Sequence, residues 1–145
     1  MAEKPNILRK NMTHEIQKDL TASLRQFTGG GKVFRSWLPT VVYTEGIQHL
    51  AREAGAYWLI DAIIAHFPTK KMAAAQIEDY RVREAQYWRL KVDCNDSAIL
   101  SAEADAGEKP FIVQKIPFTD FPLGKVEIWA EFDGQRWTLL LPSEH

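Results

Sequence analysis

Asp61 is the residue whose surroundings in the sequence most favour chemistry. It is the one acidic residue in the apolar segment AYWLIDAIIAHF, which runs from Ala56 to Phe67. A carboxylate in a buried segment must find hydrogen-bond partners or take up a proton. Tyr57 lies four residues earlier, on the same side of a helix. We interpret Asp61 and Tyr57 as buried structural polar groups, because structural networks perturb carboxylates as well. An enzyme centred on Asp61 is the alternative.

Three residues spaced by four, Glu45, His49 and Glu53, would share one face of a helix and point toward a common metal ion. Such spacing is also common on solvated helix faces, and Arg52 beside them would repel a cation. The other histidines are scattered, and no serine or cysteine stands in a nucleophile motif. Cys94, at the end of a predicted strand, is expected in the core. The sequence therefore predicts no catalytic residue, no metal site and no cofactor.

Trp129 is the residue that we expect to anchor a partner protein. Along an alternating strand, Glu127 and Glu131 point to the same side as Trp129. Across the predicted hairpin, Thr138 is expected opposite Trp129, and Arg136 opposite Glu131. Exposed tryptophans are frequent hot spots of binding surfaces. The sequence thus predicts a partner-binding surface of Trp129, Glu127, Glu131 and Arg136, with a purely structural cover over an arginine stem or a loop as the alternative.

A second candidate surface is basic. The first 71 residues contain ten Lys or Arg against six Asp or Glu, and the remainder contain eight against thirteen. Six of these basic residues would contact nucleic-acid phosphates, and they are Arg9, Lys10, Lys18, Arg25, Lys32 and Arg35. The charge density is modest, and the formal net charge of -1 gives no general attraction to polyanions. Nucleic-acid binding is therefore an alternative to protein binding.

Length and composition limit the possible classes. A chain of 145 residues with 46% hydrophobic residues fits one globular domain. A single cysteine and no apolar signal segment favour a reducing, cytoplasmic location. A membrane span needs about 20 apolar residues, and Asp61 interrupts the longest apolar run well before that length. We expect no membrane association, and composition leaves the oligomeric state open.

The longest apolar run predicts one central helix from Thr44 to Phe67. Thr44 is a suitable N-cap, Pro68 ends the helix, and the second half is expected to be buried on all sides. Residues 1–12 are polar and predicted to form a flexible tail. Two further helices are predicted over residues 13–27 and 69–80, the first ending at the glycines 29–31. These glycines lack the Lys-Ser/Thr ending of a phosphate-binding loop.

The second half of the chain changes from a helical to an alternating period. Strands are predicted over residues 87–94, 98–105 and 111–118, and on both sides of the Asp133-Gly134 turn. A two-residue turn there places Ala130 opposite Trp137 and Ile128 opposite Leu139. The predicted fold is α+β, a single domain over residues 13–145. In it, about three helices pack on one face of an antiparallel sheet of about five strands.

Several segments resemble a family of small bacterial proteins of unknown function. They are YTEGIQHLAREAGAYWLIDAI (43–63, including AGAYWLIDAI), FTDFPL (118–123) and LLLPSE (139–144), with LTASLRQFTGGG (20–31) similar to the family's opening block. Gly30 and Gly31 depart from the family pattern, in which a polar and an acidic residue are expected. The resemblance implies an association with plasmids, phages and other mobile elements, and it assigns no catalytic residue.

Without a catalytic constellation, the leading hypothesis is a non-catalytic interaction protein. The resemblance adds that such a protein would be encoded by a mobile element and would bind a host or defence-system protein as an inhibitor. Nucleic-acid binding and an enzyme centred on Asp61 are the alternatives.

Overall fold

The computed structural model describes residues 15 and 17–145, so the predicted tail, the helix start at Thr13 and Ile16 lie outside the described residues. A helical segment covers residues 17–24. The elements that follow are β1 (Val33–Arg35), β2 (Val41–Thr44), α2 (Glu45–Ala54), α3 (Tyr57–Ala65), α4 (Lys70–Glu78), η1 (Tyr80–Arg83), β3 (Ala85–Val92), β4 (Ala98–Glu103), β5 (Ile112–Ile116), β6 (Lys125–Phe132), β7 (Trp137–Leu140) and η2 (Pro142–Glu144).

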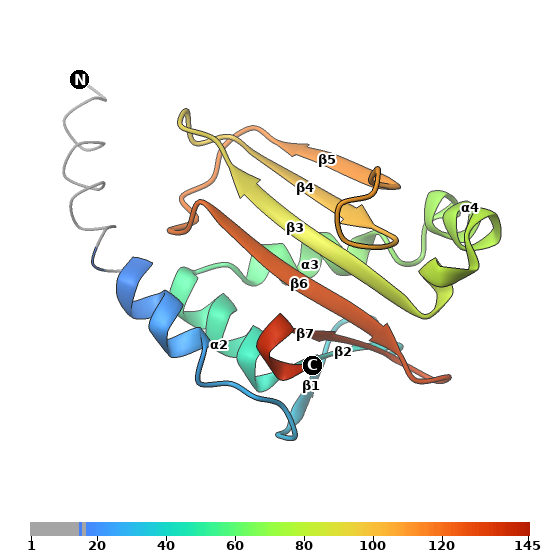
Figure 1. Cartoon of the computed structure of the whole chain (residues 1–145), viewed down its shortest axis with the longest axis horizontal. Coiled ribbons are helices and arrows are strands. Elements are labelled where there is room, and N and C mark those ends of the chain that lie inside the picture. Colours follow the sequence, from blue (N-terminus) through green and yellow to red (C-terminus); the bar gives the residue numbers. More distant parts are fainter. Residues whose placement is uncertain (1–14, 16) are drawn as a thin grey trace.

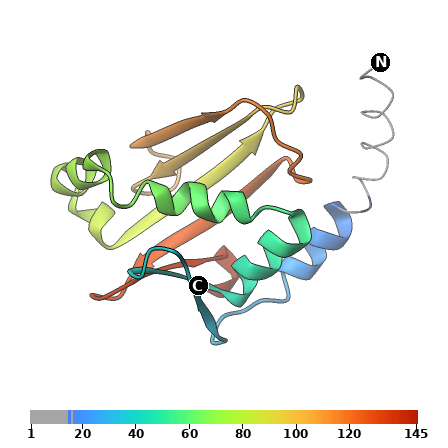
Figure 2. The same ribbon diagram turned by 180° about the vertical axis from the view of Figure 1, so that it is seen from behind.

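In the described part of the chain, the strands form one seven-stranded sheet in the order β1-β2-β7-β6-β3-β4-β5. β2 and β7 pair in parallel, and the other neighbouring pairs are antiparallel. Figures 1 and 2 show from two sides that α2 and α3 lie on the same face of this sheet. The predicted α+β single domain is confirmed. The predicted sheet of about five antiparallel strands was too small, and it missed the parallel pair.

The additional strands come from the segment between the glycine loop and α2. β1 has three residues and β2 has four, which is too short for an alternating pattern to identify a strand. The place of β2 in the sheet depends on a distant partner, because Val42 pairs with Thr138 of β7. A hydrogen bond of 2.7 Å from the Trp137 N–H to the Thr40 carbonyl extends this pairing. Local sequence therefore does not reveal it.

The predicted central helix is two helices, α2 and α3, separated at Gly55. Gly55 has a φ of 62°, and its N–H caps the last carbonyls of α2. Glycine adopts this left-handed conformation without the steric cost that a Cβ imposes. The N-cap prediction at Thr44 is confirmed by a hydrogen bond of 3.3 Å from the Ile47 N–H to its hydroxyl. The break was missed because apolar residues continue on both sides of Gly55.

The core lies between the helices and one face of the sheet. α3 contributes the buried side chains Leu59, Ile60, Ile63 and Ile64, and the strands contribute alternate residues such as Trp88, Leu90, Leu100, Ile128 and Leu139. Gln86 is also completely buried. Its Nε2 donates to the Val82 carbonyl at 3.1 Å, and its Oε1 accepts from Trp88 Nε1 at 3.0 Å. Both ends of the amide are therefore satisfied inside the core.

The β6–β7 hairpin exists, but its register differs by two residues from the prediction. Phe132 pairs with Trp137, so residues 133–136 form the turn. The Asp133 carboxylate accepts hydrogen bonds from the N–H groups of Gln135 and Arg136, at 2.9 and 2.8 Å. A side chain that bonds the backbone two or three residues ahead stabilises this longer loop. A shift of two residues preserves the two faces of each strand, so the alternation prediction still holds.

Candidate binding surface

The sheet face opposite α2 and α3, here called the open face, carries the predicted partner-binding residues. Figure 1 looks onto this face, with α3 behind the sheet. Along β6, the even-numbered residues Val126, Ile128 and Ala130 are buried in the core. The residues between them therefore project from the open face, and they are Lys125, Glu127, Trp129 and Glu131. The structure brings three of the four predicted residues together, namely Glu127, Trp129 and Glu131.

Trp129 lies at the centre of an aromatic cluster on this face. Its ring meets Tyr87 of β3 edge-to-face, with centroids 5.3 Å apart, and His145 at 5.1 Å. The residue opposite it on β7 is Leu140, where Thr138 was expected. His145 Nδ1 lies 2.5 Å from a carboxylate oxygen of Glu131. Trp129 is thus partly buried and held in one orientation, which reduces the entropy that a tryptophan loses on binding.

Arg89 connects the acidic residues beside Trp129. Its guanidinium lies 3.4 Å from Glu127 and 3.7 Å from Glu103. Glu103 is among the buried charged residues, so pairing with Arg89 compensates part of its desolvation. Nε of Arg89 is buried without a hydrogen-bond partner. The arginine is therefore fixed between two glutamates and presents little free positive charge on the open face.

Three hollows follow one another along β6. The first, of about 410 Å³, includes Lys125 and Glu127 in its lining. The second, of about 50 Å³, includes Glu127, Trp129 and Tyr87. The third, of about 320 Å³, includes Glu131. At about 3.3 Å per residue, the distance from Lys125 to Glu131 is roughly 20 Å. The open face therefore offers a hollowed track with Trp129 in the middle.

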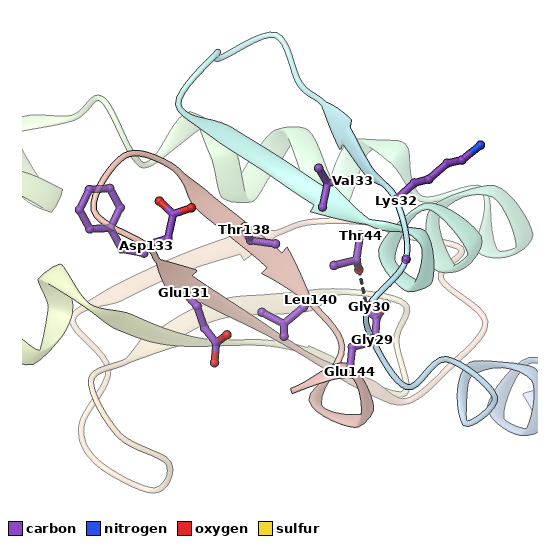
Figure 3. Close-up of a pocket in the computed structure, with 12 residues that line it drawn as sticks. Gly29, Gly30, Lys32, Val33, Thr44, Glu131, Asp133, Thr138, Leu140 and Glu144 are labelled. Carbon is purple, nitrogen blue, oxygen red and sulfur yellow. Dashed lines mark hydrogen bonds between the residues drawn. The ribbon is translucent and has the colours of Figure 1, made fainter.

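Figure 3 shows the third hollow, bounded by the glycine loop, β7 and the C-terminal residues. The Glu144 carboxylate accepts from the Thr44 hydroxyl at 2.6 Å, the dashed line in the figure, and from the Leu141 and Gly46 N–H groups at 2.9 and 3.2 Å. A Cβ on Gly46 would lie 2.5 Å from this carboxylate. Glu144 therefore accepts hydrogen bonds from donors at the start of α2, and its role in lining this hollow is structural.

Asp61 and Tyr57 were expected to be buried, and both are exposed. The apolar side chains of α3 cover its inner face, and these two residues, four apart, lie on the outer face of the same helix. Burial raises the pKa of Tyr43 of β2, and the charges of Tyr57 and Asp61 act in the same direction. No hollow described above includes either residue. The buried polar residues that the sequence prediction missed are, among the described residues, Gln86, Glu103 and Thr119.

The remaining predicted residues are dispersed. Arg136 lies in the hairpin turn and not opposite Glu131, because Glu131 pairs with Thr138. The predicted nucleic-acid residues Arg9 and Lys10 lie outside the described residues. The other four are exposed, but on three different parts of the fold: Lys18 and Arg25 at the helical segment 17–24, Lys32 after the glycine loop, and Arg35 in β1.

The side chains on the helix face with Glu45, His49 and Glu53 do not converge on one point, because two of them have different hydrogen-bond partners. The Lys32 N–H donates to Glu45 at 3.2 Å, and His49 shares a hydrogen bond of 2.9 Å with Ser23. Within the described range, no group of three or more His, Cys, Asp or Glu side chains is placed to hold a metal ion. Cys94 was expected in the core and is exposed, because β3 ends at Val92 before reaching it.

The helices of the described residues include none that is long and apolar enough to cross a membrane. Comparison with curated proteins returns no match, and comparison with solved structures returns none either. A family profile does match, over residues 18–145, and its description is "Family of unknown function (DUF6876)". This match covers all strands of the sheet and the whole open face. The chain therefore belongs to the family of unknown function DUF6876.

Proposed function

We propose that this chain is a non-catalytic binding protein that holds a partner protein against the open face of its sheet, with Trp129 as the anchor. The observation that carries the proposal is the arrangement along β6, where Trp129 lies between two larger hollows and touches a third. Hot spots of binding surfaces are enriched in tryptophan and tyrosine and cluster near the centre of the interface, as Trp129 and Tyr87 do on this track.

The charges on the track indicate what the partner presents. Glu127 and Glu131 flank Trp129. Arg89 contacts Oε1 of Glu127 and His145 contacts Oε2 of Glu131, so the other oxygen of each carboxylate is the one that a partner would reach. A lysine or arginine of the partner would find a carboxylate on either side and the face of an indole ring between them, which favours a cation–π contact. We therefore propose a partner segment with a basic residue at its centre.

The biological setting of this proposal comes from the sequence resemblance. A cytoplasmic protein encoded by a plasmid or phage would use such a surface to bind, and inhibit, a host or defence-system protein. An enzyme centred on Asp61 has less support, because Asp61 is exposed and lies away from the hollows of the open face.

The test compares two tryptophans. Tagged protein captures partners from a lysate of the encoding organism, followed by mass spectrometry and by affinity measurement with the purified partner. Trp129→Ala should lower the affinity by about 30-fold, the effect of losing a hot spot of about 2 kcal/mol. Trp37, in the turn between β1 and β2, is 57% exposed, so Trp37→Ala is the matched control and should bind normally.

A folding defect must be separated from a binding defect, because Trp129 is partly buried. The double variant Glu127→Arg, Glu131→Arg leaves the indole in place and reverses both carboxylates. It should also lose the partner while keeping the thermal unfolding midpoint within a few degrees. Equal capture by wild-type protein, Trp129→Ala and the charge-reversed variant would show that the open face is not the binding surface.

A further inference from the structure

The hollow at the start of β6 combines an apolar lining with unpaired positive charge. This groove lies between the helical segment 17–24, the beginning of β6 and η2, and has a volume of about 410 Å³. Val126 and Leu141 in its lining are buried, and Leu24, Leu123 and Pro142 are partly buried. The volume falls within the range of about 300–1,000 Å³ that is typical of ligand sites. The groove can therefore receive an apolar group.

Arg25 and Lys125 give the groove its charge. Both line it and both are exposed, and neither forms a salt bridge with another residue in the described part of the chain. Lys91 pairs directly with Lys125 across β3 and β6, which adds a third positive charge beside the groove. Like charges in register oppose each other, so an incoming anion would relieve this repulsion.

The single acid of the lining does not neutralise these cations. Glu127 lies at the groove's inner end and pairs with Arg89 of β3, at 3.4 Å. It also lines the small hollow under Trp129, so the groove continues directly into the central part of the track. A ligand bound at Trp129 would therefore extend into the groove along β6.

We propose that this groove binds a segment of the partner protein in which an apolar side chain is followed by a carboxylate. The apolar side chain packs on Leu24 and Val126, and the carboxylate lies between Arg25 and Lys125. This inference rests on the proposed function, and it fixes how the charges of the partner segment are arranged along β6. The acidic residue lies at the Lys125 end of β6, and the basic residue lies at the Glu131 end.

The experiment uses small probes, so that it does not depend on knowing the partner. Uniformly ¹⁵N-labelled protein is titrated with the blocked peptide acetyl-leucyl-glutamyl-amide, and separately with acetyl-leucyl-lysyl-amide. Amide shifts near Leu24 and Val126 report on the groove. We expect the glutamyl peptide to bind about tenfold more tightly than the lysyl peptide. Its carboxylate forms weak ion pairs with Arg25 and Lys125, whereas the lysyl ammonium is repelled by both.

Charge reversal supplies the control. In the double variant Arg25→Glu, Lys125→Glu, the preference should change to the lysyl peptide. The double variant Lys70→Glu, Lys71→Glu makes the same change in net charge at two exposed positions of α4, and should leave the preference unchanged. Equal binding of the two peptides by the wild-type protein, or no shift with either, would overturn the proposal.

Two further probes separate this inference from its alternatives. Octanoate combines an apolar chain with a carboxylate but has no peptide backbone. If octanoate binds and neither peptide does, the groove is a site for a free fatty acid or similar carboxylate, and the proposal of a partner segment is overturned. If Trp129→Ala loses the partner but the wild-type protein shows no preference between the two peptides, the groove proposal is contradicted and the proposed function stands. If Trp129→Ala captures the partner as well as the wild-type protein does, the proposed function is contradicted, and the peptide titration still decides the groove proposal.

Discussion

Replacing Gln86 tests the buried network that fixes β3 against the helices. Gln86→Leu keeps a similar volume but leaves the Trp88 indole N–H and the Val82 carbonyl without their partner. An unsatisfied buried group costs about 1–3 kcal/mol. Offset by the apolar gain of leucine, the expected loss of unfolding free energy is about 2–4 kcal/mol. The melting temperature should fall by about 6–12 °C for a chain of this size.

The loss is measured by urea denaturation monitored by tryptophan fluorescence. Gln135→Leu makes the same chemical change at an exposed position of the hairpin turn, and should alter stability by less than about 0.5 kcal/mol. Trp88→Phe removes the indole donor, so the double variant with Gln86→Leu should be about 1 kcal/mol more stable than the sum of the single effects. Additive effects, or a Gln86→Leu protein as stable as the wild type, would refute the role assigned to this amide.

Three other substitutions test local features of the fold. Gly55→Ala should cost about 1–2 kcal/mol in urea denaturation because of its φ of 62°, whereas Gly55→Asn should cost less. Gly46→Ala should destabilise by more than about 1 kcal/mol, because its methyl would meet the Glu144 carboxylate, and a normal midpoint would argue against this contact. Hydrogen bonds from Arg81 hold the pKa of Asp79 below its ordinary value. The charged carboxylate therefore stabilises the fold fully at pH values above the ordinary pKa, and this stabilisation is lost as the pH falls through the lowered pKa. Arg81→Met should raise the pKa of Asp79 into the ordinary range of an aspartate in a carbon-13 NMR titration and make stability less sensitive to acid; an unchanged titration would contradict the ion pair.

The sequence predicted those features that depend on neighbours a few residues apart. The cap at Thr44, the helix that follows Thr69, the alternation of β3 and β6 and the α+β class all follow from local spacing, and the structure has them. The place of β2 in the sheet was not predictable, because it depends on pairing with β7, about one hundred residues away, and β1 joins the sheet through β2. The helix break at Gly55 was present in the sequence but was outweighed by the apolar residues around it.

The candidate site was predicted in part for the same reason. Alternation identified Glu127, Trp129 and Glu131 as residues of one face. It could not reveal Tyr87 beside Trp129, because that contact depends on the β3–β6 register. Arg136 was misplaced by assuming the shortest turn, and Asp61 by assuming that an apolar helix is buried all round. In α3 the apolar side chains fill one side, and the outer side keeps Tyr57 and Asp61 in solvent.

The insertion of β7 between β2 and β6 has a consequence for synthesis on the ribosome. Until residues 137–140 leave the exit tunnel, β1 and β2 have no connection to the other strands, and β6 keeps an unpaired edge. At about 5–20 residues per second, the nascent chain carries these edges for several seconds after β2 has emerged. Completion of the sheet therefore waits for the synthesis of β7, and a chain truncated before residue 137 would carry two open edges that invite aggregation.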